Sequence, residues 1–91
     1  MLSLYTAFDV QMELRDFISQ SRKLKKLSVE ELSTRSGVPY GTIRKFESTG
    51  NISLRQFLML YEAIGDLNKV RALTKPSSAQ PTSIEEVLKN A

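Results

Sequence analysis

The sequence predicts an all-α protein, a small bundle of five helices in a single domain with a short tail. Three observations predict this class. Apolar residues recur every three or four positions along most of the chain, which is the spacing of one helix face, and no segment alternates as a half-buried strand does. Residues that cap helices precede these segments, and glycines follow several of them. Finally, 91 residues are enough for one domain and too few for two.

The first predicted helix runs from near Asp9, an acceptable N-cap, to about Lys25. Cations lie in its last turn, where the helix dipole favours positive charge. The apolar residues expected to form its inward face are Val10, Leu14, Phe17, Ile18 and Leu24. Residues 1–8 are assigned to an N-terminal extension, and residues 9–73 to the folded domain.

A second and a third helix are predicted over Val29 to about Ser48, joined by a tight turn. Ser28 is the expected N-cap of the second helix, and Glu31, three residues later, completes a capping box. Gly37 is expected to end that helix, because glycine adopts the left-handed conformation without steric cost. Pro39 fits near the start of the third helix, where its missing N–H is tolerated.

The fourth predicted helix spans Leu54–Ile64, with Ser53 as its N-cap and Gly65 after its end. It carries the clearest apolar stripe in the sequence, formed by Leu54, Phe57, Leu58, Tyr61 and Ile64. A short fifth helix is expected over about Leu67–Leu73.

The composition changes after the fifth helix, so residues 74–91 are assigned to a linker and a tail. Proline and serine are frequent over residues 74–81, which is typical of a linker. Ser83 then precedes a short amphipathic segment, Ile84–Leu88, with Glu86 in the position that completes a capping box. We expect either a frayed terminus or a short tail helix that docks elsewhere.

The composition excludes several classes of protein. The chain has no cysteine, so it forms neither a disulfide nor a thiolate metal site, and it has no histidine, the commonest general base. We therefore expect no enzyme activity, no metal and no cofactor. No apolar run approaches the roughly 20 residues that span a bilayer. The first residues lack the basic start of a signal peptide, so the expected location is the cytoplasm.

Positive charge is concentrated in the middle of the chain. Residues 22–55 contain eight basic and three acidic side chains, a net charge of +5, whereas the remaining residues carry five basic and seven acidic ones, a net charge of −2. A basic patch of this kind provides the salt-sensitive part of nucleic-acid affinity. A solvated helix face would have the same charge, so the patch alone leaves both interpretations open.

The second and third helices meet the steric constraints of a helix-turn-helix, with the small Ser33 at the close approach, Gly37 four residues later and Ile43 six beyond it. The full predicted scaffold is Leu32, Ser33, Gly37, Val38, Ile43 and Phe46. With these residues in this order, the chain resembles the Cro/CI-like (Xre) family over about Leu14–Leu73, most closely in residues 27–38 and 41–47. The resemblance implies a five-helix, lambda-repressor-like bundle that reads DNA as a two-fold symmetric dimer.

The chain departs from the family pattern at five positions. Val29 stands where the family usually has a glutamine that meets a DNA phosphate, and Ser33 replaces the usual alanine. Lys26 stands where a glycine commonly ends the first helix. Pro39 and Gly41 occupy the start of the recognition helix, where polar residues are frequent. These departures leave fewer side chains for reading bases than is usual in the family.

By the same resemblance, base edges would be contacted by Tyr40, Thr42, Arg44 and Lys45. Arg44 is the expected sequence reader, because its guanidinium can hold guanine O6 and N7 together, an interaction of about 1–3 kcal/mol. Phosphate contacts are expected from Arg22, Lys23, Lys26, Ser28, Asn51 and Ser53.

Each of these residues also has a structural alternative. Tyr40 would otherwise cover the start of its helix, and Gly41 would either admit the DNA backbone closely or simply be tolerated at a helix start. The basic candidates would compensate the helix dipole and keep the protein soluble, and Ser28 and Ser53 would act as caps. Glu47 is expected to have a structural role, paired with a cation such as Arg35.

The expected partners are double-stranded DNA and a second copy of the chain. The fourth and fifth helices have more apolar residues than a thin bundle needs for its core. The candidates for a dimer interface are therefore Met59, Leu60, Leu67, Val70 and Leu73; the alternative is that these residues close the core of the monomer. The leading hypothesis is a dimeric repressor of a palindromic operator, associated with the nucleoid when bound. A first alternative, from the resemblance to regulators of the HipB type, is an antitoxin of a HipA-type kinase toxin. A second is a protein-interaction module without DNA binding.

Overall fold

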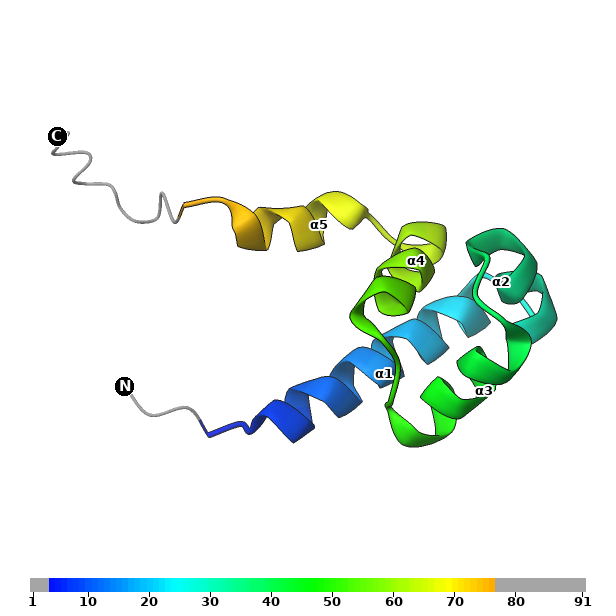
Figure 1. Cartoon of the computed structure of the whole chain (residues 1–91), viewed down its shortest axis with the longest axis horizontal. Coiled ribbons are helices and arrows are strands. Elements are labelled where there is room, and N and C mark those ends of the chain that lie inside the picture. Colours follow the sequence, from blue (N-terminus) through cyan, green and yellow to red (C-terminus); the bar gives the residue numbers. More distant parts are fainter. Residues whose placement is uncertain (1–3, 77–91) are drawn as a thin grey trace, which may run out of the picture.

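The computed structural model describes residues 4–76, and within this range all regular secondary structure is helical, as the sequence predicts (Figure 1). Its helices are α1 (Ala7–Leu24), α2 (Val29–Ser36), α3 (Tyr40–Thr49), α4 (Leu54–Ile64) and α5 (Leu67–Arg71), and a 3₁₀ turn, η1 (Ala72–Thr74), follows α5. The predicted amphipathic segment Ile84–Leu88 and most of the predicted linker lie outside the described residues.

Helix α1 begins three residues earlier than predicted, and Asp9 is not its N-cap. Thr6 is the N-cap: its hydroxyl accepts a hydrogen bond from the Asp9 N–H (3.1 Å). The Asp9 carboxylate in turn accepts a hydrogen bond from the Thr6 N–H (3.0 Å), so the two residues form a capping box. The folded domain therefore includes Thr6, Ala7 and Phe8, which were predicted to belong to the extension. Together, Thr6 and Asp9 satisfy two N–H groups at the start of the helix, whereas Asp9 as the N-cap would satisfy one.

The predicted boundaries of α2 and α4 are confirmed. The Ser28 hydroxyl accepts from the Glu31 N–H (3.0 Å), and the Glu31 carboxylate accepts from the Ser28 N–H (2.8 Å). Gly37 ends α2 in the left-handed conformation, with φ of 81°. Ser53 caps α4 by accepting from the Gln56 N–H (3.1 Å). Each boundary depends on residues close together in the chain, which explains why the sequence predicts it.

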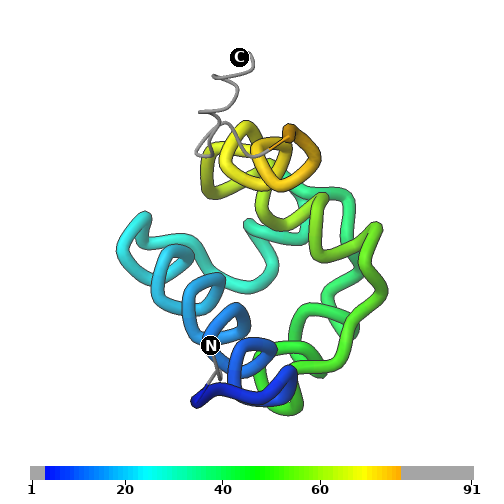
Figure 2. Tube along the Cα trace, turned by 90° about the vertical axis from the view of Figure 1, so that its left-hand side faces the viewer, coloured from blue at the N-terminus to red at the C-terminus, as the bar shows by residue number. Residues whose placement is uncertain are grey.

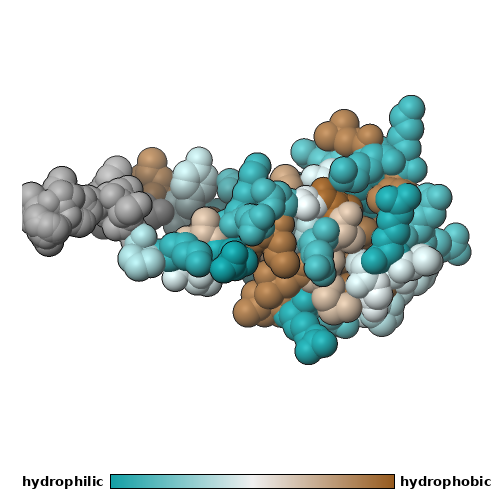
Figure 3. Space-filling view, turned by 90° about the horizontal axis from the view of Figure 1, so that it is seen from above, coloured by the Kyte–Doolittle hydropathy of each residue, from teal (hydrophilic) through white to brown (hydrophobic). Residues whose placement is uncertain are grey.

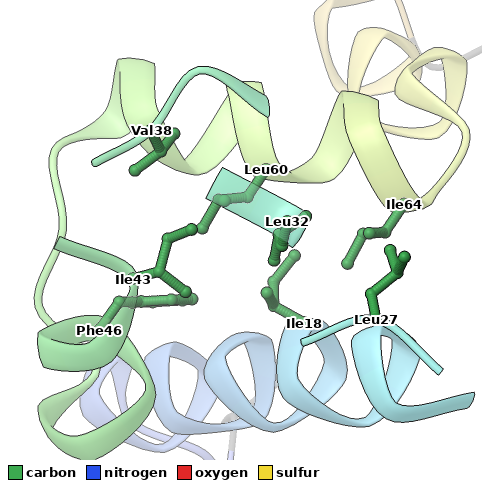
Figure 4. Packing of buried hydrophobic residues seen from close by; sticks show 8 residues of the cluster. All are labelled: Ile18, Leu27, Leu32, Val38, Ile43, Phe46, Leu60 and Ile64. Atoms are coloured by element: carbon green, nitrogen blue, oxygen red, sulfur yellow. The ribbon is translucent and has the colours of Figure 1, made fainter. Parts of the chain in front are cut away.

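The core lies where α1, α2, α3 and α4 converge (Figure 4). Its buried members are Ile18, Leu27, Leu32, Val38, Ile43, Phe46, Leu60 and Ile64. Four of these, Leu32, Val38, Ile43 and Phe46, are the apolar members of the predicted helix-turn-helix scaffold. The Phe46 ring also meets the Phe57 ring edge-on, with centroids 6.2 Å apart, which connects α3 to α4.

The apolar face predicted for α1 is wrong for most of its residues. Only Ile18 is buried, whereas Leu24 is 83% exposed and Leu14 and Phe17 are each 40% exposed. The reason is geometric: α1 has 18 residues, a length of about 27 Å, and its N-terminal half extends past the bundle (Figure 1). Phe17 is partly covered because its ring stacks on the Tyr61 ring of α4, at 5.4 Å between centroids.

The buried face of α4 also differs from the prediction. Leu54, the first residue of the predicted stripe, is 74% exposed, whereas Leu60 is completely buried. Leu60 therefore belongs to the core and is not a candidate for a dimer interface. The stripe shifts because α4 packs against α2 as well as α1, so two neighbouring helices bury a different sector of its surface.

Helix α5 forms an arm at the end of α4, directed away from α2 and α3 (Figure 1). Seen from the side, the arm and α1 lie at opposite edges of the molecule (Figure 2). The described part of the chain buries no residue of α5 or η1 completely, and Leu73 is 83% exposed. The arm thus presents apolar side chains that the rest of the described structure leaves uncovered.

Candidate nucleic-acid interface

The turn between α2 and α3 is held by side chains as well as by glycine. The Ser33 hydroxyl donates a hydrogen bond to the Val38 carbonyl (2.6 Å), and the Ser36 hydroxyl accepts one from the Val38 N–H (3.1 Å). Gly37, between them, has the positive φ that the turn requires. Ser33 therefore does more than leave room for a close approach, because its hydroxyl fixes the path of the chain into α3. The sequence predicts only that Ser33 is small enough for the close approach of the two helices.

An ion pair fixes α3 against α1 on its inner side. The Arg22 guanidinium binds the Glu47 carboxylate through two hydrogen bonds, Nε to Oε2 (2.8 Å) and Nη2 to Oε1 (2.9 Å). Its Nη1 donates to the Leu27 carbonyl (2.8 Å), and the Ser19 hydroxyl donates to Glu47 at 3.4 Å. The two charged side chains are only 12% and 14% exposed. Hydrogen bonding to Glu47 raises the pKa of Arg22, so the guanidinium stays charged.

This ion pair corrects two predictions. Glu47 pairs with Arg22 and not with Arg35, because Glu47 lies on the side of α3 that faces α1. Arg22 was expected among the phosphate contacts, but its guanidinium is turned inward and bound to two protein groups. Arg22 is therefore a structural residue that positions α3.

The outer face of α3 carries the predicted base-reading residues. Tyr40 is 43% exposed, Arg44 and Lys45 are exposed, and Thr42 is half-buried. The Arg44 Nη1 donates to the Tyr40 hydroxyl (2.8 Å), and its guanidinium carbon lies 5.7 Å from the centre of the Tyr40 ring. Tyr40 thus holds the Arg44 side chain over the first turn of α3, a contact that residues four apart on a helix can make.

Only positive charge is exposed on α3. Its three charged residues are Arg44, Lys45 and Glu47, and the last of these is nearly buried against Arg22. Gly41 lies at the start of the same helix, and a Cβ added there would meet no other atom within 4 Å. The start of the helix therefore lacks side-chain bulk at Gly41, and the exposed Arg44 and Lys45 follow one turn later.

The remaining candidates lie at the ends of the neighbouring helices. Lys23 and Lys26 are exposed after the core-contacting part of α1, and Lys26 has a φ of 58°, a conformation that is unusual for a residue with a side chain. Ser28 and Ser53 act as the N-caps of α2 and α4. Asn51 is exposed, and its Oδ1 accepts a hydrogen bond from Gln11 Nε2 (3.2 Å).

Gln11 also belongs to this region, and the sequence did not predict it. Besides its bond to Asn51, the Gln11 amide donates to the Gly50 carbonyl (2.6 Å), so it joins α1 to the loop after α3. Its sequence position carries no signal for this role, because the partner loop is about forty residues away.

Within residues 4–76 there is no cluster of three or more His, Cys, Asp or Glu side chains placed to hold a metal ion. None of the helices described is long and apolar enough to cross a membrane. No protein-family model, no curated protein and no solved structure matches the chain.

Proposed function

We propose that this protein is a sequence-specific DNA-binding regulator of transcription that places α3 in the major groove. The observation that carries the proposal is the charge arrangement of α3: Arg44 and Lys45 are exposed, while Glu47 is held against Arg22 on the inner side. A helix whose exposed charges are all positive suits a polyanion. The resemblance of residues 27–38 and 41–47 to the Cro/CI-like family supports the same function.

In this proposal Arg44 reads sequence, and Lys23 and Lys26 set position. The Tyr40 hydroxyl orients the Arg44 guanidinium, whose donors match guanine O6 and N7 in the major groove. Gly41 lets the backbone of α3 come close to the DNA, since it adds no side chain there. Lys23 and Lys26 are exposed and available to neutralise phosphates, which fixes register without reading sequence, whereas Lys45 is exposed next to Arg44 and is placed with it toward the base edges.

The proposal includes a homodimer that represses from a palindromic operator. The partly or fully exposed apolar residues of the arm, Leu67, Val70 and Leu73, supply its contact surface. Met59 contributes less, because it is half-buried beside Gly37 and packs against the core. A two-fold dimer would present α3 twice, so that each half of a palindrome is read by one copy.

Fluorescence anisotropy with the DNA upstream of the protein's own gene tests the proposal, with a random duplex as competitor. We expect affinity to fall steeply with salt. Arg44→Ala should reduce the preference for the specific duplex by about 1–3 kcal/mol, roughly 5- to 150-fold, whereas Lys23→Ala should weaken both duplexes alike and lower the salt slope by about one. Lys75→Ala, a cation beyond α5, is the matched control and should change neither. Equal binding of specific and random DNA by wild type and Arg44→Ala contradicts the proposal.

One observation favours a second candidate, an antitoxin that also binds a protein partner. The first turns of α1 expose Phe8 (63%) and Val10 (44%), which are not among the candidate DNA contacts, so a partner protein and DNA would use different side chains. By the resemblance to HipB-type regulators, that partner would be a HipA-type kinase. Co-expression with the neighbouring gene product tests this: a stable complex lost in Phe8→Asp supports it, and elution of the protein alone contradicts it.

A further inference from the structure

An apolar groove of about 470 Å³ lies between α1, α4 and α5. Leu14 of α1 forms one wall, Val70 and Leu73 of the arm form the other, and Leu54, Phe57 and Leu58 line the α4 side. Hydrophobic surface is exposed in the middle of the molecule, between the arm and the α2–α3 end (Figure 3).

The groove leaves large apolar side chains in contact with water. Leu54 is 74% exposed, Leu73 83% and Leu14 40%. Covering such surface is worth about 25 cal/mol for each Å² removed from water, and contiguous apolar patches on soluble domains usually mark a binding site. The groove lies away from the outer face of α3, since none of Tyr40, Arg44 and Lys45 lines it.

We propose that residues 83–89 of this same chain occupy the groove as a short amphipathic helix. This segment reads Ser-Ile-Glu-Glu-Val-Leu-Lys, so Ile84, Val87 and Leu88 fall at positions i, i+3 and i+4 and share one face of a helix. An apolar helix face laid into an apolar groove is a recurrent mode of recognition.

The connection between groove and segment is short enough to favour this occupant. Residues 77–82 extend the chain by about 20 Å at most, and they follow η1, whose Leu73 lines the groove. A short linker gives the attached segment an effective concentration in the millimolar range, so a weak helix–groove contact is sufficient.

The charges of the two partners are also complementary. The segment carries Glu85 and Glu86 against one cation, Lys89, a net charge of −1. The arm beside the groove carries Lys69, Arg71 and Lys75, against a single acid, Asp66. Opposite charges at the rim orient the segment, while the apolar face supplies most of the affinity.

Docking of the segment has a consequence for association. The docked segment would cover Val70 and Leu73, which the proposed dimer also uses, so the segment and a second copy of the chain compete for the arm. The docking itself requires no DNA binding, and its test is independent of the function proposed above.

Disulfide trapping in the full-length protein tests the proposal, because the chain has no cysteine of its own. Leu54→Cys with Val87→Cys places one thiol on the exposed rim of the groove and one on the apolar face of the segment. Under mild oxidation we expect an intramolecular disulfide, seen as a faster-migrating monomer. It should form about tenfold faster than in the control Thr34→Cys with Val87→Cys, because Thr34 lies on α2, which contributes nothing to the groove.

Two results of the disulfide experiment overturn the proposal. Equal rates in the test and control pairs mean that the segment does not dock, and a disulfide-linked dimer in place of the monomer means that the segment of a second copy is the occupant. A second measurement needs no cysteine: Val87→Asp with Leu88→Asp should raise the fluorescence of a bound apolar dye severalfold and shift the protein toward dimer. Gln80→Asp with Thr82→Asp, which adds the same charge before the segment, should leave the dye signal near that of wild type, and an unchanged signal in the Val87→Asp, Leu88→Asp variant also overturns the proposal.

Discussion

The Arg22 guanidinium on α1 holds the Glu47 carboxylate on α3 through two nearly parallel hydrogen bonds of 2.8 and 2.9 Å. Such a bidentate pair fixes both distance and orientation. It therefore sets the position of α3 against α1, and it withdraws the only acid of α3 from the face that carries Arg44 and Lys45. One contact thus serves both the packing of the bundle and the charge of the candidate interface.

Removing Arg22 should destabilise the protein clearly. Arg22→Ala leaves the Glu47 carboxylate nearly buried without its partner, and we expect a loss of about 2–3 kcal/mol in the free energy of unfolding by urea. Arg15→Ala is the matched control, because the Arg15–Asp16 pair (3.0 Å) has side chains 27% and 53% exposed and should change stability by no more than about 0.5 kcal/mol. Similar losses in the two variants would contradict the structural role of Arg22.

Removing the Tyr40 hydroxyl should affect discrimination rather than folding. Tyr40→Phe keeps the ring near Arg44 but deletes the acceptor of the 2.8 Å hydrogen bond. If Arg44 reads sequence as proposed, the preference for specific over random DNA should fall by up to about tenfold, the value of one modest hydrogen bond. Competition anisotropy measures this ratio and urea unfolding checks the fold. A Tyr40→Phe protein with unaltered discrimination would show that Tyr40 does not orient Arg44.

Two glycines near the interface should respond to alanine in opposite directions. Gly41 is helical and open on its outer side, so Gly41→Ala should stabilise the protein by about 0.5–1 kcal/mol. Gly37 has a φ of 81°, so Gly37→Ala should cost about 1–2 kcal/mol. For a domain of this size these changes move the melting temperature by about 4–8 °C per kcal/mol, which calorimetry resolves. A lower melting temperature for Gly41→Ala would refute the assignment of Gly41 as an open helical position.

The capping box of α2 predicts a pH-dependent contribution to stability. Hydrogen bonds from the backbone and side chain of Ser28 lower the pKa of Glu31 below its ordinary value. A carboxyl whose pKa is lower in the folded state stabilises the fold above its unfolded-state pKa, and that contribution is lost as the pH falls through the folded-state pKa. Glu31→Gln should therefore be less stable than wild type at pH 7, and the difference should shrink on acidification.

Urea unfolding of both proteins from about pH 7 to pH 3 measures this difference across the ordinary carboxyl range. Glu30→Gln, on the same turn but outside the capping box, is the control and should show a smaller difference. A gap between Glu31→Gln and wild type that stays constant over the whole range would mean that the charge of Glu31 does not contribute.

The helix boundaries were predictable wherever they depend on neighbours in the chain. Ser28 with Glu31, Gly37 and Ser53 each act over no more than four residues, and all were predicted correctly. The error at Asp9 has the same local origin, because Thr6 and Asp9 are both capping residues, lie three apart and form one capping box, in which Thr6 is the N-cap. The inward positions of Leu32, Val38, Ile43 and Phe46 were also predictable, because short helices joined by tight turns have few ways to bury an apolar stripe.

The sequence alone thus determines where the helices begin and end and that the protein is all-α, because caps and helical periodicity are local properties. Only the tertiary structure decides which apolar residues are covered. Leu60 is buried and Leu14 is not, because burial depends on which helices pack together and how far α1 extends beyond them. The tertiary structure likewise decides that Glu47 binds Arg22, 25 residues away, and so which charges remain on the surface of α3. Periodicity marks an apolar face, but it does not show which partner covers it.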